Sequence, residues 1–173
     1  VNLEYANEKG IMVFHTPGRN ATAVADFTVG MLLTECRNIA KSHNELKKGN
    51  WIRDYANAEY VPDLEGKIAG IIGYGSIGSK VAKRLRAFDM KILAYDPYYK
   101  GDEVPLVSLE KLMKESDFVL VHYRLTTETR HMINKEMLEL MKPTAYLINT
   151  ARSGLVDETA LVEALREKKI FGA

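Results

Sequence analysis

The stretch GIIGYGSIGSK, residues 70–80, decides the fold of this chain. It carries three glycines in the spacing G-x-G-x-x-G, at Gly73, Gly75 and Gly78. The pattern alone is weak, because three glycines at this spacing occur by chance. Here it directly follows a short apolar run over residues 68–72 and opens a helical pattern over residues 77–88. A strand, a glycine turn and a helix in this order predict a phosphate-binding loop.

Each glycine of the loop has a physical role in such a site. Gly73 allows the tight turn, Gly75 lets the backbone approach a pyrophosphate, and Gly78 lets the helix pack closely on the strand. The amides near Ser76 and Ile77 would then present a helix N-terminus to the phosphates. The sequence therefore predicts a dinucleotide site.

An acidic residue lies about twenty positions beyond the glycines, as such a site requires. The second strand pattern ends in ILAYDP, so that Asp96 stands at the strand end. A carboxylate there accepts hydrogen bonds from the adenosine ribose hydroxyls and repels a 2′-phosphate, which favours NAD over NADP. The competing interpretation is a purely structural turn, with Asp96 capping a loop.

The rest of the chain alternates between strand and helix patterns. Strands are expected over residues 11–15, 68–72, 91–95, 118–122 and 146–149, and one more begins at Ile170. Helices are expected over residues 77–88, 108–114, 134–141 and 157–168, the last capped by Asp157. A longer helix is expected to begin at Ala21 and to run to Lys48. Short apolar strands alternating with helices predict an α/β fold with a parallel sheet covered on both faces.

The composition excludes several classes of protein. The 173 residues carry 24 basic and 23 acidic side chains, a formal net charge of +1 with no basic stripe, so nucleic acid is not an expected partner. One cysteine, Cys36, rules out a disulfide framework and fits a reducing cytoplasm. No apolar run is long enough to span a membrane, and no signal-peptide pattern opens the chain.

A second segment, LINTARSGLVD at residues 147–157, places Arg152 at the tip of a buried strand. A guanidinium is costly there unless it holds an anion. Two interpretations stay open from the residues themselves. Arg152 binds an anionic ligand, or it pairs with an acid such as Asp157.

Four stretches together resemble the D-isomer-specific 2-hydroxyacid dehydrogenases over nearly the whole chain. They are TPGRNATAVADFTVGMLL (16–33), GIIGYGSIGSKVAKRLRAFDMKILAYDP (70–97), VHYRLTTETRHMIN (121–134) and LMKPTAYLINTARSGLVDETALVEAL (140–165). The last is the most specific. The resemblance implies a Rossmann-type doubly wound parallel sheet and hydride transfer between NAD(H) and C2 of a D-2-hydroxy or 2-keto acid.

The resemblance also assigns residues. Arg152 corresponds to the arginine that holds the substrate carboxylate and polarises the C2 oxygen. Tyr123 and Thr129 fall in the loop after the third strand of the cofactor domain, and Thr150 and Ala151 lead into Arg152 beside the nicotinamide ribose. These four, and Arg152 itself, would contact the cofactor largely through backbone atoms.

The resemblance further implies how the chain is organised. Residues 1–19 would be the end of a substrate-binding lobe and a hinge, and residues 20–173 an NAD-binding domain incomplete at its C-terminus. We expect a fragment truncated at both ends, because the chain begins with Val1 and closes on a half-strand pattern. The glutamate and histidine of the family's acid–base pair would follow that strand, so the fragment by itself is expected to be inactive. His15, His43, His122 and His131 are expected to be structural residues with satisfied hydrogen bonds.

Two departures from the family pattern stand near these positions. Arg124 occupies the place of a proline in His-x-Pro-Leu-Thr, and Ser153 the place of a glycine in Ala-Arg-Gly-Gly. They suggest a side branch of the family. The resemblance favours a phosphoglycerate-like or glycerate-like substrate.

Two other functions share this fold. One is an NAD-sensing regulatory protein of the corepressor type, which a basic or peptide-docking surface would favour. The other is a different Rossmann enzyme, such as an adenosylhomocysteine hydrolase, against which the segment NTARSGLVD argues.

A homodimer is also expected, through the helix from Ala21 to Lys48 and the loop after it. That loop gathers Trp51, Tyr55 and Tyr60, aromatic residues that a monomer would rarely expose. The region resembles the dimer contact of the family. In the competing interpretation, these aromatics cover the domain's own core.

Overall fold

The computed structural model describes residues 2–52 and 61–173. Its centre is a parallel four-stranded sheet in the order β2-β1-β3-β4. The strands are β1 (Ile68–Ile72), β2 (Lys91–Tyr95), β3 (Phe118–Val121) and β4 (Tyr146–Asn149). The chain runs from β1 to β2 at one edge of the sheet. It then crosses back to β3 and β4 on the other side of β1, as in a doubly wound fold. The α/β Rossmann-type prediction is confirmed.

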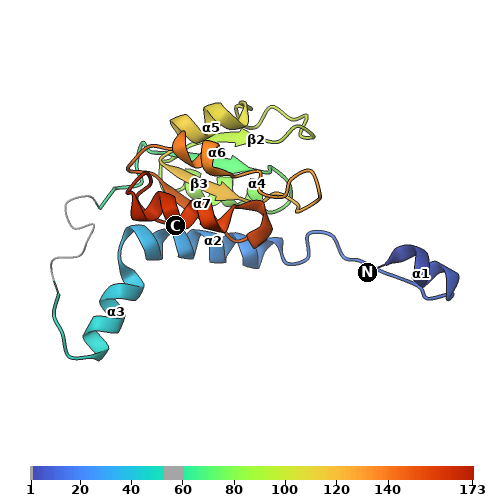
Figure 1. The fold of residues 1–173 in the computed structure, drawn as a ribbon, viewed down its shortest axis with the longest axis horizontal. Coiled ribbons are helices and arrows are strands. Elements are labelled where there is room, and N and C mark those ends of the chain that lie inside the picture. Colours follow the sequence, from blue (N-terminus) through green and yellow to red (C-terminus); the bar gives the residue numbers. More distant parts are fainter. Residues whose placement is uncertain (1, 53–60) are drawn as a thin grey trace.

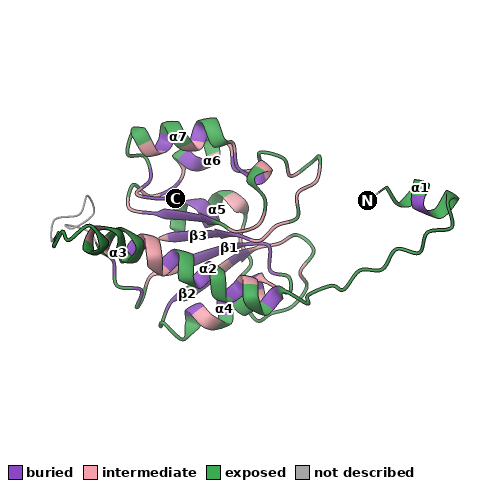
Figure 2. Ribbon diagram, turned by 90° about the horizontal axis from the view of Figure 1, so that it is seen from below, coloured by how far each residue is buried: buried purple, intermediate pink, exposed green. Residues whose placement is uncertain are grey.

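Helices cover both faces of the sheet, as Figures 1 and 2 show. On one face lie α2 (Ala21–Cys36) and α4 (Gly78–Arg86), which contact each other; α2 also contacts β4, and α4 contacts β1 and β2. On the other lie α5 (Leu109–Glu115), α6 (Lys135–Glu139) and α7 (Glu158–Arg166). A short 3₁₀ turn, η1 (Ser153–Leu155), precedes α7.

The strands are apolar on both faces because each face meets a layer of helices. All four residues of β3 are buried, and four of the five in β1. One core cluster joins Ile71, Phe118 and Tyr146 to α2 and α4, and a second joins Val119 and Leu147 to the helices of the opposite face.

Side-chain caps set the starts of four described helices, three of which the sequence predicts. The Oδ1 atom of Asp157 accepts a hydrogen bond from the backbone N–H of Ala160 at 3.1 Å, which confirms the predicted cap of α7. Ser108 and Asn134 cap α5 and α6 in the same way. The helices that Ser108, Asn134 and Asp157 cap therefore each begin one residue later than expected, because the cap itself lies outside the helix.

The first strand prediction was wrong. Residues 11–15 lie in an exposed, irregular segment between α1 (Leu3–Glu8) and α2, away from the sheet (Figure 1). An apolar run becomes a strand where another strand pairs with it, and no described strand lies beside this one.

The expectation of one helix from Ala21 to Lys48 was also wrong. The chain breaks at Asn38, which adopts the left-handed conformation with φ of 56°, and α3 (Ile39–Lys47) begins after it. Asparagine tolerates this conformation better than most residues. Apolar spacing continues across the break, so periodicity did not reveal it.

At the other end, the predicted strand is reduced to a single contact. Gly172 forms one parallel bridge with Tyr146, at the edge of β4. None of the helices in the described part of the chain is both long enough and apolar enough to cross a bilayer.

Candidate functional site

Parallel pairing brings the loops that follow the four strands to one edge of the sheet. The registers of β1 with β2, β1 with β3 and β3 with β4 all place strand ends side by side. The glycine loop follows β1, Asp96 follows β2, Tyr123 lies beyond β3, and Arg152 lies beyond β4. In such sheets ligands bind outside the carboxyl ends of the strands. The residues that the sequence assigned to the nucleotide and substrate site therefore lie at or near this edge.

The glycine loop needs glycine at two of its positions. Gly73 has φ of +93°, and a Cβ there would lie 2.8 Å from the carbonyl oxygen of His122. A Cβ on Gly78 would collide with the carbonyl oxygen of Gly73. The turn is therefore packed tightly against the exit of β3 and against its own first residue. This agrees with the roles expected for both glycines.

The loop leaves backbone donors open. The amides of Ser76 and Ile77 donate to no group in the described part of the chain, and no side chain caps the start of α4. A Cβ at Gly75 would meet nothing within 4 Å, so the backbone there is open to a ligand. Open amides at a helix N-terminus form an anion site.

Asp96 is bonded to the glycine loop and lines the same pocket. Its Oδ2 atom accepts a hydrogen bond from the amide of Tyr74 at 2.9 Å, and its Oδ1 atom accepts one from the amide of Tyr98 at 2.9 Å. Each carboxylate oxygen can accept a further bond. The carboxylate therefore holds the loop, as the structural interpretation of Asp96 expects, and also lines the pocket, as the ligand-binding interpretation requires.

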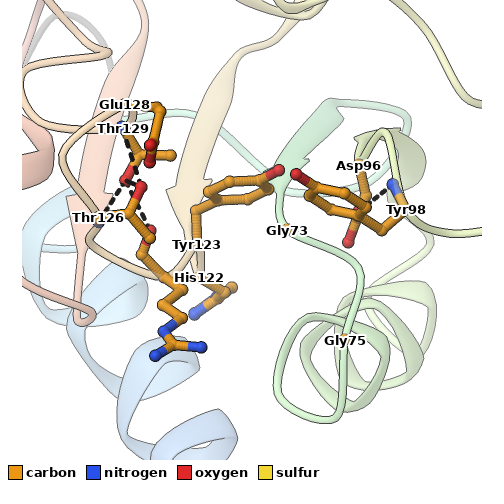
Figure 3. Close-up of a pocket in the computed structure, with 10 residues that line it drawn as sticks. Gly73, Gly75, Asp96, Tyr98, His122, Tyr123, Thr126, Glu128 and Thr129 are labelled. Atoms are coloured by element: carbon orange, nitrogen blue, oxygen red, sulfur yellow. Dashed lines mark hydrogen bonds between the residues drawn. The ribbon is translucent and has the colours of Figure 1, made fainter.

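A pocket of about 500 Å³ lies between these loops (Figure 3). Tyr123 and Tyr98 face each other across it. Burial raises the pKa of Tyr123 to about 12, so its phenol is neutral at pH 7. The lining residues are Gly73, Gly75, Asp96, Tyr98, His122, Tyr123, Arg124, Thr126, Glu128 and Thr129.

Thr129 shapes the loop that closes one side of the pocket. Its hydroxyl donates to the carbonyl oxygen of Arg124 at 2.8 Å and accepts from the amide of Thr126 at 2.7 Å. The side chain thus holds the loop, whereas the sequence suggested a backbone contact to a ligand.

The histidine prediction was wrong for His122. Its Nε2 atom is buried and has no hydrogen-bond partner among the described residues. Burial lowers the pKa of this imidazole to about 4, so it is neutral at pH 7. The other three histidines are exposed.

The loop that carries Arg152 is held by its neighbours. Asn149 accepts a hydrogen bond from the amide of Ala151 at 3.0 Å and donates one to the carbonyl oxygen of Arg152 at 3.0 Å. The hydroxyl of Thr150 lies 2.7 Å from the hydroxyl of Thr28 in α2, which ties the loop to that helix.

Arg152 itself is exposed and lines a separate hollow of about 310 Å³ with Ala151 and Glu158. Its Nη1 atom donates to the carbonyl oxygen of Ala151 at 2.8 Å. It forms no ion pair with a described residue, and Asp157 is occupied in capping α7. The pairing of Arg152 with Asp157 is therefore not observed, and the guanidinium remains open to an anion.

Some residues of the site were not singled out for it by the sequence. They are Tyr98, Arg124, Thr126 and Glu128 in the pocket and Thr28 and Asn149 behind the Arg152 loop. The pocket residues share one signal, since each follows a strand end within ten positions. Thr28 had no local signal, because it meets Thr150 across 122 residues of sequence.

The edge has the features that a dinucleotide requires: open amides for phosphate, a carboxylate for ribose and a pocket lined by aromatic rings. Within the described residues, no group of three or more His, Cys, Asp or Glu side chains is arranged to hold a metal.

Known proteins agree with this assignment. Residues 29–173 match the model of the D-isomer specific 2-hydroxyacid dehydrogenase family, NAD binding domain. The whole chain aligns with hydroxypyruvate reductase of Thermotoga maritima at 43% identity and with glyoxylate reductase of Thermofilum pendens at 44%, covering 56% and 53% of those proteins. It thus spans about half the length of these curated relatives.

Solved structures agree as well. D-lactate dehydrogenase from Aquifex aeolicus, complexed with NAD and lactic acid, superposes with a TM-score of 0.85 at 39% identity, over 98% of this chain and 52% of that one. Sequence and structure give the same result: the chain belongs to the D-isomer specific 2-hydroxyacid dehydrogenase family and contains its NAD-binding domain.

Proposed function

We propose that this protein catalyses NAD-dependent interconversion of a D-2-hydroxy acid and the corresponding 2-keto acid. The observation that carries the proposal is Arg152, a cation that forms no ion pair with a described residue and lies at the same sheet edge as the nucleotide pocket. A planar guanidinium binds a carboxylate with two parallel hydrogen bonds. The nicotinamide, when bound, supplies or accepts the hydride.

Different residues bind the phosphates, the ribose and the substrate. The amides of Ser76 and Ile77 bind the pyrophosphate beside Gly75, and Asp96 binds the adenosine ribose. Tyr123, Thr150 and Ala151 line the path of the cofactor towards the substrate. Arg152 orients the acid and polarises its C2 oxygen, with Asn149 and Thr28 keeping its loop in place.

The same proposal divides the chain at residue 19. Residues 20–173 form the cofactor domain, and residues 1–19 connect it to the substrate-binding lobe. We expect the 173 residues by themselves to bind NADH without turning over a keto acid, because no histidine follows Arg152 in this sequence. The buried, unbridged Cys36 thiol suits the reducing cytoplasm, where we place the enzyme.

Two of the relatives are a hydroxypyruvate reductase and a glyoxylate reductase, so we propose a small 2-keto acid as substrate. The test is NADH oxidation by the protein as the cell makes it, against glyoxylate, hydroxypyruvate, phosphohydroxypyruvate and pyruvate. At least one should be reduced to a D-2-hydroxy acid. If NADH binds and no keto acid is reduced, the dehydrogenase proposal fails and the NAD-sensing function takes its place.

We further propose that the protein is a homodimer through α2, α3 and the segment after α3. Large apolar side chains there are open to solvent: Phe27, Met31, Ile39, Leu46 and Trp51. Trp51 is 75% exposed, so it does not cover the domain's own core. Tyr55 and Tyr60 lie outside the described residues. Several large apolar side chains exposed on neighbouring segments are typical of a protein interface.

Replacing Trp51 with Glu should weaken the dimer by roughly 100-fold, because a buried tryptophan is often among the strongest contacts of an interface. Sedimentation velocity over a range of concentrations measures this. Val162→Glu on α7, which also replaces an exposed apolar residue, should leave the dimer intact. A wild-type protein that stays monomeric at high concentration would rule out the dimer.

A further inference from the structure

The chain that leaves β3 divides the pocket into two sides. The amide of His122 still donates to the carbonyl oxygen of Ile72 at 2.8 Å, so the extended pairing continues past Val121. Successive side chains of extended backbone point in opposite directions. In Figure 3, Tyr123 points towards Tyr98 and Asp96, whereas His122 turns away from them. Alternation therefore places Arg124 on the same side as His122.

The backbone between His122 and Tyr123 lies against the glycine loop. A Cβ on Gly73 would stand 2.8 Å from the carbonyl oxygen of His122 and 3.1 Å from the amide nitrogen of Tyr123. The backbone before Arg124 thus runs in contact with the turn whose amides are open. Gly75 and Arg124 line the same pocket, so a phosphate bound beside Gly75 would border the pocket that holds Arg124.

Arg124 is the positively charged residue among those that line the pocket. Among the ten lining residues it is the one basic side chain that is charged at pH 7, because burial lowers the pKa of His122 to about 4. Two acids also line the pocket. Asp96 is bonded to two backbone amides, and a hydrogen bond from the side chain of Thr126 lowers the pKa of Glu128.

Neither acid neutralises the arginine. Arg124 forms no ion pair with any residue that the structure describes, and its guanidinium donates to none of them. An exposed arginine is common, but this one faces a pocket beside open amides. A free guanidinium fork matches the geometry of phosphate oxygens.

We propose that Arg124 binds the pyrophosphate of the dinucleotide, as a second phosphate-recognising element beside the glycine loop. The inference rests on the NAD site described above and adds a residue to it, at a position where the family pattern has a proline. An arginine here supplies charge that a proline cannot. Binding of NAD(H) should therefore depend on salt more strongly than backbone amides by themselves would cause.

The test is nucleotide binding to the 173-residue chain with Arg124 replaced by Gln, Lys or Pro. Arg124→Gln and Arg124→Pro should weaken the binding of both NADH and ADP-ribose by roughly 5- to 20-fold, the scale expected for one charge-assisted contact. Adenosine, which has no phosphate, should bind wild type and variants with the same dissociation constant. Arg124→Lys should recover part of the loss, because it keeps the charge without the fork.

Arg130→Gln is the matched control, since Arg130 is an exposed arginine of the same loop that does not line this pocket. It should bind NADH as wild type does. Equal affinities for NADH in wild type and Arg124→Gln would overturn the inference while leaving the NAD site intact. So would a loss confined to NADPH, which would indicate the 2′-phosphate, or an equal loss for adenosine. A wild-type chain that binds no nucleotide would instead contradict the NAD site itself.

Discussion

Replacing Gly78 with alanine should abolish measurable NADH binding and lower the stability of the domain. The added Cβ collides with the carbonyl oxygen of Gly73. Gly73 cannot yield, because its φ of +93° and its contact with His122 fix it from the other side. Overpacking a closed contact costs about 1–3 kcal/mol. For a domain of this size, that corresponds to a fall in Tm of roughly 3–10 °C.

The effect on binding should exceed the effect on folding. Any shift that relieves the collision moves the amides of Ser76 and Ile77, and those amides hold the phosphates. We expect the affinity for NADH to fall by at least about 100-fold, since several charge-assisted hydrogen bonds are lost together. Fluorescence titration and thermal unfolding measure the two quantities on one sample.

Two glycine variants make this test specific. A Cβ on Gly30 in α2 would meet nothing within 4 Å, so Gly30→Ala should leave the affinity unchanged and raise Tm by a few degrees, because alanine favours the helix by about 0.5–1 kcal/mol. Gly75→Ala should leave Tm unchanged but lower the affinity for NADH, because the added Cβ would enter the space that the ligand occupies. If Gly78→Ala binds NADH as tightly as wild type, the loop is not the phosphate site.

Replacing Arg152 with glutamine should reduce kcat/KM for the keto acid by about 1,000-fold in the protein as the cell makes it, about 4 kcal/mol of transition-state stabilisation. The guanidinium forms charge-assisted bonds to the carboxylate and to the C2 oxygen, and an amide replaces neither the charge nor the fork. Affinity for NADH should stay within about twofold, because Arg152 lines the hollow beside the nucleotide pocket and not the pocket itself.

Arg152→Lys should recover part of the loss, mostly in KM. Arg166→Gln, in the last turn of α7, removes an equal charge away from the site and should leave the kinetics unchanged. An Arg152→Gln enzyme with nearly normal kcat/KM would show that another residue holds the substrate. A selective loss of NADH affinity would place Arg152 in the cofactor site instead.

The site was predictable where chemistry and spacing coincide along the chain. Gly73, Gly75 and Gly78 follow a buried strand at fixed offsets, and Asp96 ends the next strand, so parallel pairing alone brings them together. Asp157 was predictable as a cap because a cap acts on amides two or three residues away. These are local or register-determined relations, and the structure agrees with them.

What the sequence could not show depends on contacts between distant residues. The break at Asn38 interrupts a helix whose apolar spacing continues, and the segment at residues 11–15 has strand composition without a strand beside it. The Nε2 atom of His122 finds no partner among the residues that the structure describes, and Thr28 bonds to Thr150; both facts depend on the packing of separate elements. A sequence pattern carries no signal for such pairs.

The central claim is that the nucleotide pocket beside Asp96 is selective for NAD. It is tested most directly by titrating the 173-residue chain and its Asp96→Ala and Asp96→Asn variants with NADH and with NADPH. Asparagine keeps an oxygen that can accept the hydrogen bond from the amide of Tyr74, but it removes the negative charge. It therefore separates the role of Asp96 in holding the glycine loop from its repulsion of a 2′-phosphate. We predict that wild type binds NADH at least about 10-fold more tightly than NADPH and that both variants bring this ratio close to one. A folded wild-type chain that binds both nucleotides equally, or an unchanged ratio in both variants, would contradict the account.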